Sequence, residues 1–120
     1  MIAANINIIL IVTGVLTLGA ALVFFVPGVV LKTVFGVSAP DDATQLVTRH
    51  WGLVVALVGA LLVYAGYHPE LRVPVMAIAA TEKLALGELV LGSSLRRRSL
   101  LVIIVAADAV MATLYLIFLL

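Results

Sequence analysis

Ionisable side chains occur inside long apolar segments of this sequence, where they are energetically expensive. A charge near the centre of a bilayer costs roughly 2.5–3.5 kcal/mol on insertion scales, so each one needs a partner, a cavity or a path to the interface. Carboxyl groups in such a setting can donate and accept protons, and cationic groups can hold an anion. Six residues are of this kind: Arg49, His50, Glu82, Lys83, Glu88 and Asp108.

The segments around these residues have the composition of a membrane protein. The 120 residues are 65% hydrophobic and 11% charged, with a mean hydropathy of +1.34, whereas soluble domains are about 25% charged. A bilayer core about 30 Å thick needs about 20 apolar residues in a helix. We therefore predict an all-α fold, a polytopic membrane four-helix bundle formed by a single domain over 1–120, with a short interfacial segment after the first span. The predicted spans are about Ala4–Val26, Ala43–Gly66, Leu71–Gly92 and Ser99–Leu120.

The basic residues between the spans predict the orientation. Lys32 and Arg96–Arg98 fall on one side of the membrane, and Arg72 falls on the other. By the positive-inside rule, the side richer in Lys and Arg is cytoplasmic. We therefore predict a multi-pass protein of the cell (inner) membrane with both termini outside, which is the periplasm in a bacterium.

Helical rise brings several of the charged residues to similar depths. Counted from the cytoplasmic ends of the predicted spans, Arg49 lies ~9 Å deep, and Lys83 and Asp108 each lie ~13 Å deep. Glu82 lies ~15 Å deep, and Glu88 lies only ~6 Å deep, near the headgroups. Residues of both signs from three spans therefore meet in the cytoplasmic half, which predicts a buried charge cluster.

A stripe of small residues on the second span indicates a close helix contact. Small residues at this spacing let helix backbones approach in membranes, and the stripe suits packing within one chain or across a homo-oligomer. Arg49 shares the stripe and is therefore expected to point into the bundle. The first span offers Thr13, Thr17 and Ala20 as a mildly polar wall. The stripe consists of Arg49, Gly52, Ala56, Gly59, Val63 and Gly66.

Two further relationships follow from helical geometry. Tyr115 shares a face of the fourth span with Asp108 and lies one layer outward from it. Glu82 and Lys83 are neighbours and point about 100° apart, so they cannot both aim at one point. One of them is expected to face the bundle centre, and the other a neighbouring helix or subunit.

The charge cluster is the candidate functional site, and a purely structural polar network is the alternative. His50 is either an interfacial hydrogen-bonding residue or a proton relay, and Trp51 is either an aromatic anchor or a pocket wall. Glu82 and Asp108 are the catalytic candidates if the protein is an enzyme. We predict no cofactor and no metal site. The predicted ligand-binding residues are Arg49, His50, Trp51, Glu82, Lys83, Asp108 and Tyr115.

The layout resembles the small four-helix bacterial membrane proteins described as DoxX-like. The resemblance covers most of the chain by layout but depends on a few residues: Phe25-Val26-Pro27-Gly28 through Phe35-Gly36, Thr48-Arg49-His50-Trp51-Gly52, and Thr81-Glu82-Lys83. It implies a four-helix membrane protein and carries over no functional residues.

Three hypotheses of function remain open at this point. The first is a protein that binds or translocates a small molecule or protons, in which Arg49 and Lys83 hold an anionic group or Glu82 and Asp108 exchange protons. The second is a membrane enzyme that uses its paired carboxyls on a lipophilic substrate, as an isomerase, a cyclase or in epoxide opening. The third is an accessory subunit of a membrane complex. The expected partners are the lipid bilayer, a lipophilic or anionic small molecule and a second copy of the chain, and nucleic acid is not expected.

Overall fold

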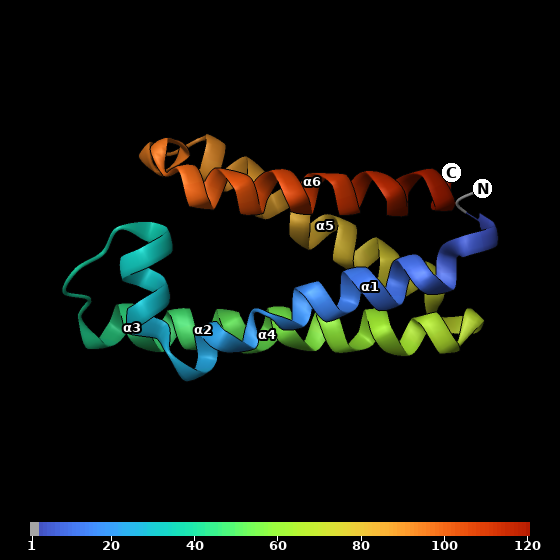
Figure 1. Ribbon diagram of the computed structural model, residues 1–120, viewed down its shortest axis with the longest axis horizontal. Coiled ribbons are helices and arrows are strands. Elements are labelled where there is room, and N and C mark those ends of the chain that lie inside the picture. The colour runs from blue at the N-terminus through green and yellow to red at the C-terminus, as the bar shows by residue number, and fades with distance from the viewer. Residues whose placement is uncertain (1–2) are drawn as a thin grey trace.

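The fold consists of two antiparallel helix pairs. The computed structural model describes residues 3–120, which form helices and no strands. In one pair, α1 (Ile6–Leu18) and α2 (Ala21–Phe25) run along α4 (Asp42–Tyr67), and in the other α5 (Arg72–Leu91) runs along α6 (Ser99–Leu119). Figure 1 shows the start of the described chain and the end of α6 at the same end of the molecule. We call the opposite end, which carries α3 (Pro27–Val30), the α3 end.

The first predicted span is long and apolar enough to cross a membrane over Ile6–Phe25, but its helix is interrupted at Gly19 and Ala20, between α1 and α2. Around Gly19 the backbone hydrogen bonds shorten to the i→i−3 pattern, with the Gly19 N–H donating to the Leu16 carbonyl at 3.1 Å and the Ala20 N–H to that of Thr17 at 3.0 Å. The Thr17 hydroxyl also donates to the Thr13 carbonyl one turn earlier. Glycine weakens a helix interior, and threonine hydroxyls bonded back to the chain bend helices, so both act at this break.

A short helical segment follows α2, at the position where the sequence predicts an interfacial segment. Pro27 starts α3, and a π-helical turn, η2 (Leu31–Phe35), follows. Gly36 ends that turn in the left-handed region at φ 76°, where a side chain would be strained. Asp41 then caps α4, because its carboxylate accepts a 2.8 Å hydrogen bond from the Thr44 N–H.

The remaining connections are short. The 3-10 turn η3 (Pro69–Leu71) joins α4 to α5, and the 3-10 turn η4 (Ser94–Arg97) joins α5 to α6. At the α3 end, the Arg98 guanidinium donates to the carbonyls of Val34 and Thr33 at 3.4 and 3.3 Å. Arg98 therefore links the start of α6 to η2.

The small-residue stripe of α4 packs against the first helix of the same chain, and this resolves the choice that the sequence left open. A Cβ atom added to Gly59 would lie 2.6 Å from the Leu18 backbone nitrogen, and one added to Gly52 would lie 2.6 Å from the Val23 Cβ. Gly14 on α1 is equally tight, because an added Cβ would lie 2.8 Å from the Gly59 carbonyl oxygen. The two backbones are therefore in direct contact along this seam.

The two helix pairs pack most closely at the end that holds the termini. There a core of apolar side chains from α1, α4, α5 and α6 includes Leu10, Leu62, Met76 and Ala112, each fully buried. A smaller core at the α3 end is built on α5 and α6 from Val90, Leu101 and Val105, with Val34 and Phe35 packed against it.

Three helical segments of residues 3–120 are long and apolar enough to cross a membrane: Ile6–Phe25, Asp42–Tyr67 and Ser99–Leu119. This is the composition of a membrane protein, and it matches three of the four predicted spans. The remaining predicted span, Leu71–Gly92, corresponds to α5, which has 20 residues but carries Glu82, Lys83 and Glu88. The complete four-helix membrane bundle therefore stays a prediction.

Candidate functional site

A cavity of about 290 Å³ lies between the two helix pairs toward the α3 end. The break in the first helix forms part of its wall through Gly19 and Ala20. Residues of α4, α5 and α6 contribute to its wall, and the first helix and the α3–η2 segment also enclose it. Its size is at the lower limit of small-molecule pockets, which are about 300–1,000 Å³.

The cavity has one polar end and one apolar end. Thr17, Glu82, Lys83 and Asp108 form the polar end, deep in the bundle. The apolar end includes Leu101 on α6, seven residues before Asp108. At 1.5 Å per residue the cavity therefore extends about 10 Å along α6.

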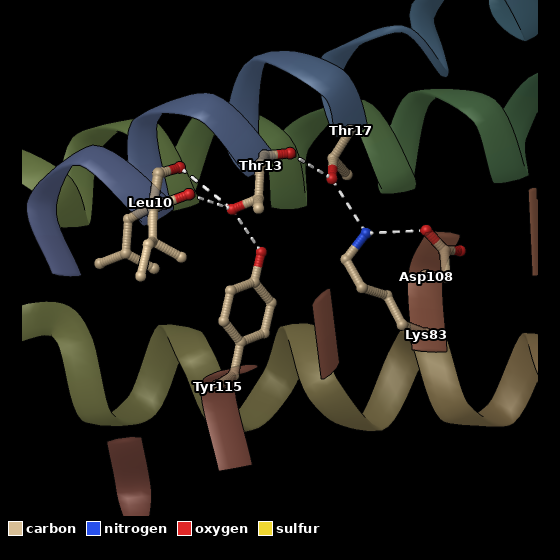
Figure 2. Close-up of polar contacts among 7 residues, drawn as sticks. Leu10, Thr13, Thr17, Lys83, Asp108 and Tyr115 are labelled. Carbon is tan, nitrogen blue, oxygen red and sulfur yellow. Dashed lines mark hydrogen bonds and ion pairs between the residues drawn. The ribbon is translucent and has the colours of Figure 1, made fainter. Parts of the chain in front are cut away.

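Lys83 is the centre of the polar end. Its side chain is 1% exposed, and its ammonium donates to Asp108 Oδ1 at 3.2 Å and to the Thr17 hydroxyl at 2.9 Å (Figure 2). The Asp108 side chain is 15% exposed. Lys83 is therefore the member of the Glu82–Lys83 pair that faces the bundle interior, which the sequence could not decide. Thr17 was noted in the sequence only as part of a polar wall, and it is a direct partner of the buried charge.

Glu82 also borders the cavity, although it precedes Lys83 in the chain. Its residue is partly buried, and its Oε1 atom is buried without a hydrogen-bond partner among residues 3–120. We call this oxygen the free acceptor. A buried polar atom of this kind is costly and calls for an explanation. Glu82 belongs to the cavity wall, whereas its Oε1 atom has almost no exposed surface, so the side chain has to turn before that oxygen can accept a donor from the cavity.

Tyr115 was predicted to bind ligand, but the cavity wall formed by residues 3–120 does not include it. The ring is fully buried, and its hydroxyl donates to the Thr13 hydroxyl at 2.6 Å. The Thr13 hydroxyl in turn donates to the Ile9 carbonyl at 2.6 Å. Tyr115 therefore holds α6 against α1 beside the cavity, as Figure 2 shows.

The prediction that Arg49 points into the bundle is wrong. Arg49 is exposed, its Nε donates to the Phe24 carbonyl at 2.9 Å, and its guanidinium lies 4.8 Å from the centroid of the Phe24 ring. Because α2 ends at Phe25, its last carbonyls lack partners within the helix, and the long Arg49 side chain reaches one of them.

The two residues that follow Arg49 differ from one another. His50 is exposed and lies outside the cavity wall that the described residues form. Trp51 is part of that wall, and its ring meets the Phe35 ring edge to face at 6.2 Å between centroids. Trp51 is thus the pocket wall that was one of its two predicted roles. Phe35, from η2, was not singled out in the sequence.

The described residues contain no group of three His, Asp or Glu side chains placed to hold a metal ion. Glu88 is exposed on α5 and is not part of the cavity wall that the described residues form. Comparison of the chain with known protein families, with curated proteins and with solved structures gives no match. The positions and hydrogen bonds of the side chains in the cavity wall are therefore the basis for its chemistry.

Proposed function

We propose that this is a small integral membrane protein that binds a small lipophilic molecule with a polar end group in the cavity at the α3 end. The observation that carries the proposal is the free acceptor on Glu82, which borders a cavity of about 290 Å³ with mainly apolar walls. Ligand sites commonly combine such walls with a few polar groups that fix orientation. The polar end of the ligand lies at Glu82, and its apolar body extends toward Trp51 and Phe35.

A network that only fixed the helix register would not require this arrangement. Polar contacts between membrane helices average only about 0.6 kcal/mol, while an unpaired buried polar atom costs about 1–3 kcal/mol. The Lys83–Asp108 pair and the Thr17 hydroxyl already form a complete contact across the bundle. Adding Glu82 beside them, with one oxygen unpaired in the described part of the chain, gains nothing for packing.

Ligand binding also fits the hydrogen bonds better than a proton path does. The Thr17 hydroxyl donates to the Thr13 carbonyl, and the Thr13 hydroxyl donates to the Ile9 carbonyl. The protons of both hydroxyls therefore go to main-chain oxygens. The hydrogen bond between Tyr115 and Thr13 and the hydrogen bonds of Lys83 with Thr17 and Asp108 therefore do not form one continuous chain. No proton path connects Tyr115 with Asp108 through them.

In this proposal α5 also crosses the membrane, and its charged residues Glu82 and Lys83 belong to the cavity wall. Lys32 and Arg96–Arg98 belong to connections at the α3 end, so that end is cytoplasmic by the positive-inside rule. Both termini are then outside. This layout agrees with the DoxX-like resemblance, which we retain as part of the proposal.

An enzyme is the second candidate, and one observation favours it. Asp108 is paired with Lys83, whereas the free acceptor on Glu82 has no partner among residues 3–120. Two carboxyl groups in different environments at one cavity are the usual basis for separate acid and base roles. A binding protein and an enzyme both have to bind the small molecule in the cavity, so one binding experiment tests the step that they share.

The test is native mass spectrometry of the protein released from lipid nanodiscs. The wild type is compared with Glu82→Gln and with the matched control Glu88→Gln, an exposed position on the same helix. We expect a stoichiometric small molecule on the wild type and on Glu88→Gln, and its loss from Glu82→Gln. Spectra in which the wild type carries only lipid, or in which both variants keep the molecule equally, would contradict the proposal.

A further inference from the structure

The charges at the polar end of the cavity do not cancel. Within the described residues, the cavity wall contains the ammonium of Lys83 and the carboxyl groups of Glu82 and Asp108. Lys83 and Asp108 neutralise one another at 3.2 Å. The group that remains is the carboxyl group of Glu82, so the cavity as a whole favours a positive charge. Isolated charges are stable in an apolar interior only when they are paired.

The hydrogen-bonding capacity of the polar end has the same bias. Two of the three N–H donors of Lys83 are used in hydrogen bonds to Asp108 and Thr17. The Thr17 hydroxyl donates its hydrogen bond to the Thr13 carbonyl. The carboxyl group of Glu82, which also belongs to the cavity wall, is therefore the acceptor left for a guest. Its complement is a donor, and a charged donor gives the stronger bond.

The apolar end sets the size of the guest. A cavity of 150 Å³ in another protein holds one benzene molecule, so about 290 Å³ accommodates a body of roughly two such rings. Trp51 and Phe35 from different segments close this end and meet edge to face. The walls there exclude a hydrated ion and suit a compact hydrocarbon body.

From these observations we infer that the ligand class is a small lipophilic amine, whose ammonium group donates to the carboxyl group of Glu82 while its apolar body lies against Trp51 and Phe35. This inference rests on the proposed function and specifies its ligand. It also replaces the earlier expectation of an anionic ligand, because Arg49 lies outside the cavity wall of residues 3–120 and Lys83 is paired with Asp108.

Three probes with one body and different end groups test the inference: 1-adamantylmethylamine, 1-adamantylmethanol and adamantane-1-carboxylate. Each is titrated into phosphatidylcholine proteoliposomes, with protein-free vesicles as the blank. The readout is the emission of Trp51, the single tryptophan of the chain, which lies in the cavity wall. We expect the amine to bind about tenfold or more tightly than the alcohol, since hydrogen bonds to charged groups are stronger than neutral ones. We expect no saturable signal from the carboxylate.

Glu82 variants assign the effect to the free acceptor. Glu82→Gln is expected to bring the affinity for the amine down to that for the alcohol, while Glu82→Asp and the control Glu88→Gln keep the amine preferred. The comparison of the three probes on the wild type stands even where a variant fails to fold. An unchanged Trp51 emission maximum in the absence of probe identifies the variants that do fold.

The results separate the inference from the proposed function. Equal affinities for amine and alcohol, tighter binding of the carboxylate, or no response to any probe each overturn the amine inference. The proposed function is overturned separately, when the wild type in native mass spectra carries only lipid. A retained molecule without a basic nitrogen rejects the amine and keeps the binding function.

Discussion

The Lys83 ammonium lies 2.9 Å from the Thr17 hydroxyl, and this contact joins α5 to the first helix in the last turn before the helix breaks. The break at Gly19 and Ala20 and the buried cation are therefore at one level of the bundle, beside the cavity. The same side chain also binds Asp108 on α6. One buried lysine thus connects three helices, α1, α5 and α6.

We expect Lys83→Met to destabilise the protein by about 3 kcal/mol or more, because it leaves Asp108 without its buried partner. Lys83→Met combined with Asp108→Asn removes both charges and is expected to recover part of the loss. Titration with sodium dodecyl sulfate in mixed micelles, followed by circular dichroism, measures the free energy of unfolding. Additive losses in the double variant would show that the pair is not coupled.

The contact between α1 and α4 predicts a second effect. A methyl group at Gly59 would lie 2.6 Å from the Leu18 backbone nitrogen, and backbone atoms cannot move aside cheaply. We therefore expect Gly59→Ala to destabilise the protein by about 1–3 kcal/mol, the usual cost of overpacking. Gly28→Ala is the control, since a Cβ atom there has no neighbour within 4 Å among the described residues. Equal stability of the two variants in the same unfolding assay would refute the tight seam.

Some features of the fold and of the site follow from the sequence and others do not, for physical reasons. Hydropathy correctly predicts three of the apolar helical segments, since this signal is local. The stripe through Gly52 and Gly59 correctly indicates a close helix contact, because only small residues allow it. Helical rise also gives the depth of Lys83 and Asp108, which do meet.

The position of a residue along its helix does not determine which partners its side chain contacts, and this limits the prediction of the site. Rise per residue gives height but not which neighbour a long side chain reaches, so Arg49 was expected in the bundle although it caps the Phe24 carbonyl. That carbonyl is available because α2 ends at Phe25, and the break before α2 depends on hydrogen bonds that hydropathy does not encode. The role of Tyr115 was missed similarly, since its partner Thr13 is on another helix.

Tyr115 provides a test that separates packing from binding. Tyr115→Phe keeps the buried ring but removes the hydroxyl that donates to Thr13 at 2.6 Å. We expect a loss of stability of about 1 kcal/mol or less, the scale of a single polar contact between membrane helices, and an unchanged affinity for the amine probe. Weakened amine binding, comparable to that of Glu82→Gln, would return Tyr115 to the ligand site.

Asp41 predicts a dependence of stability on pH at the start of α4. Hydrogen bonds from Thr44, the side chain first and the backbone N–H second, lower the pKa of Asp41 below its ordinary value of 3.8. The unfolded chain therefore takes up this proton more readily, so the contribution of Asp41 is present above pH 3.8 and is lost as the pH falls through the lowered pKa. Asp41→Asn keeps a capping oxygen without the charge. The difference in unfolding free energy between wild type and Asp41→Asn is expected to shrink on acidification, and a difference that grows instead would be inconsistent with the cap.

Two adjacent residues of α6 test whether the cavity itself is the binding site. Ile104 lines the cavity, whereas Ile103 is 63% exposed on the outer surface of the helix. Phenylalanine at position 104 occupies cavity volume, and we expect Ile104→Phe to bind the amine probe roughly tenfold more weakly, about 1.4 kcal/mol, which is within the usual cost of overpacking. Ile103→Phe adds the same side chain toward the lipid and is expected to leave the affinity unchanged. Equal affinities of the two variants would place the amine outside the cavity, even if Glu82 still influenced its binding.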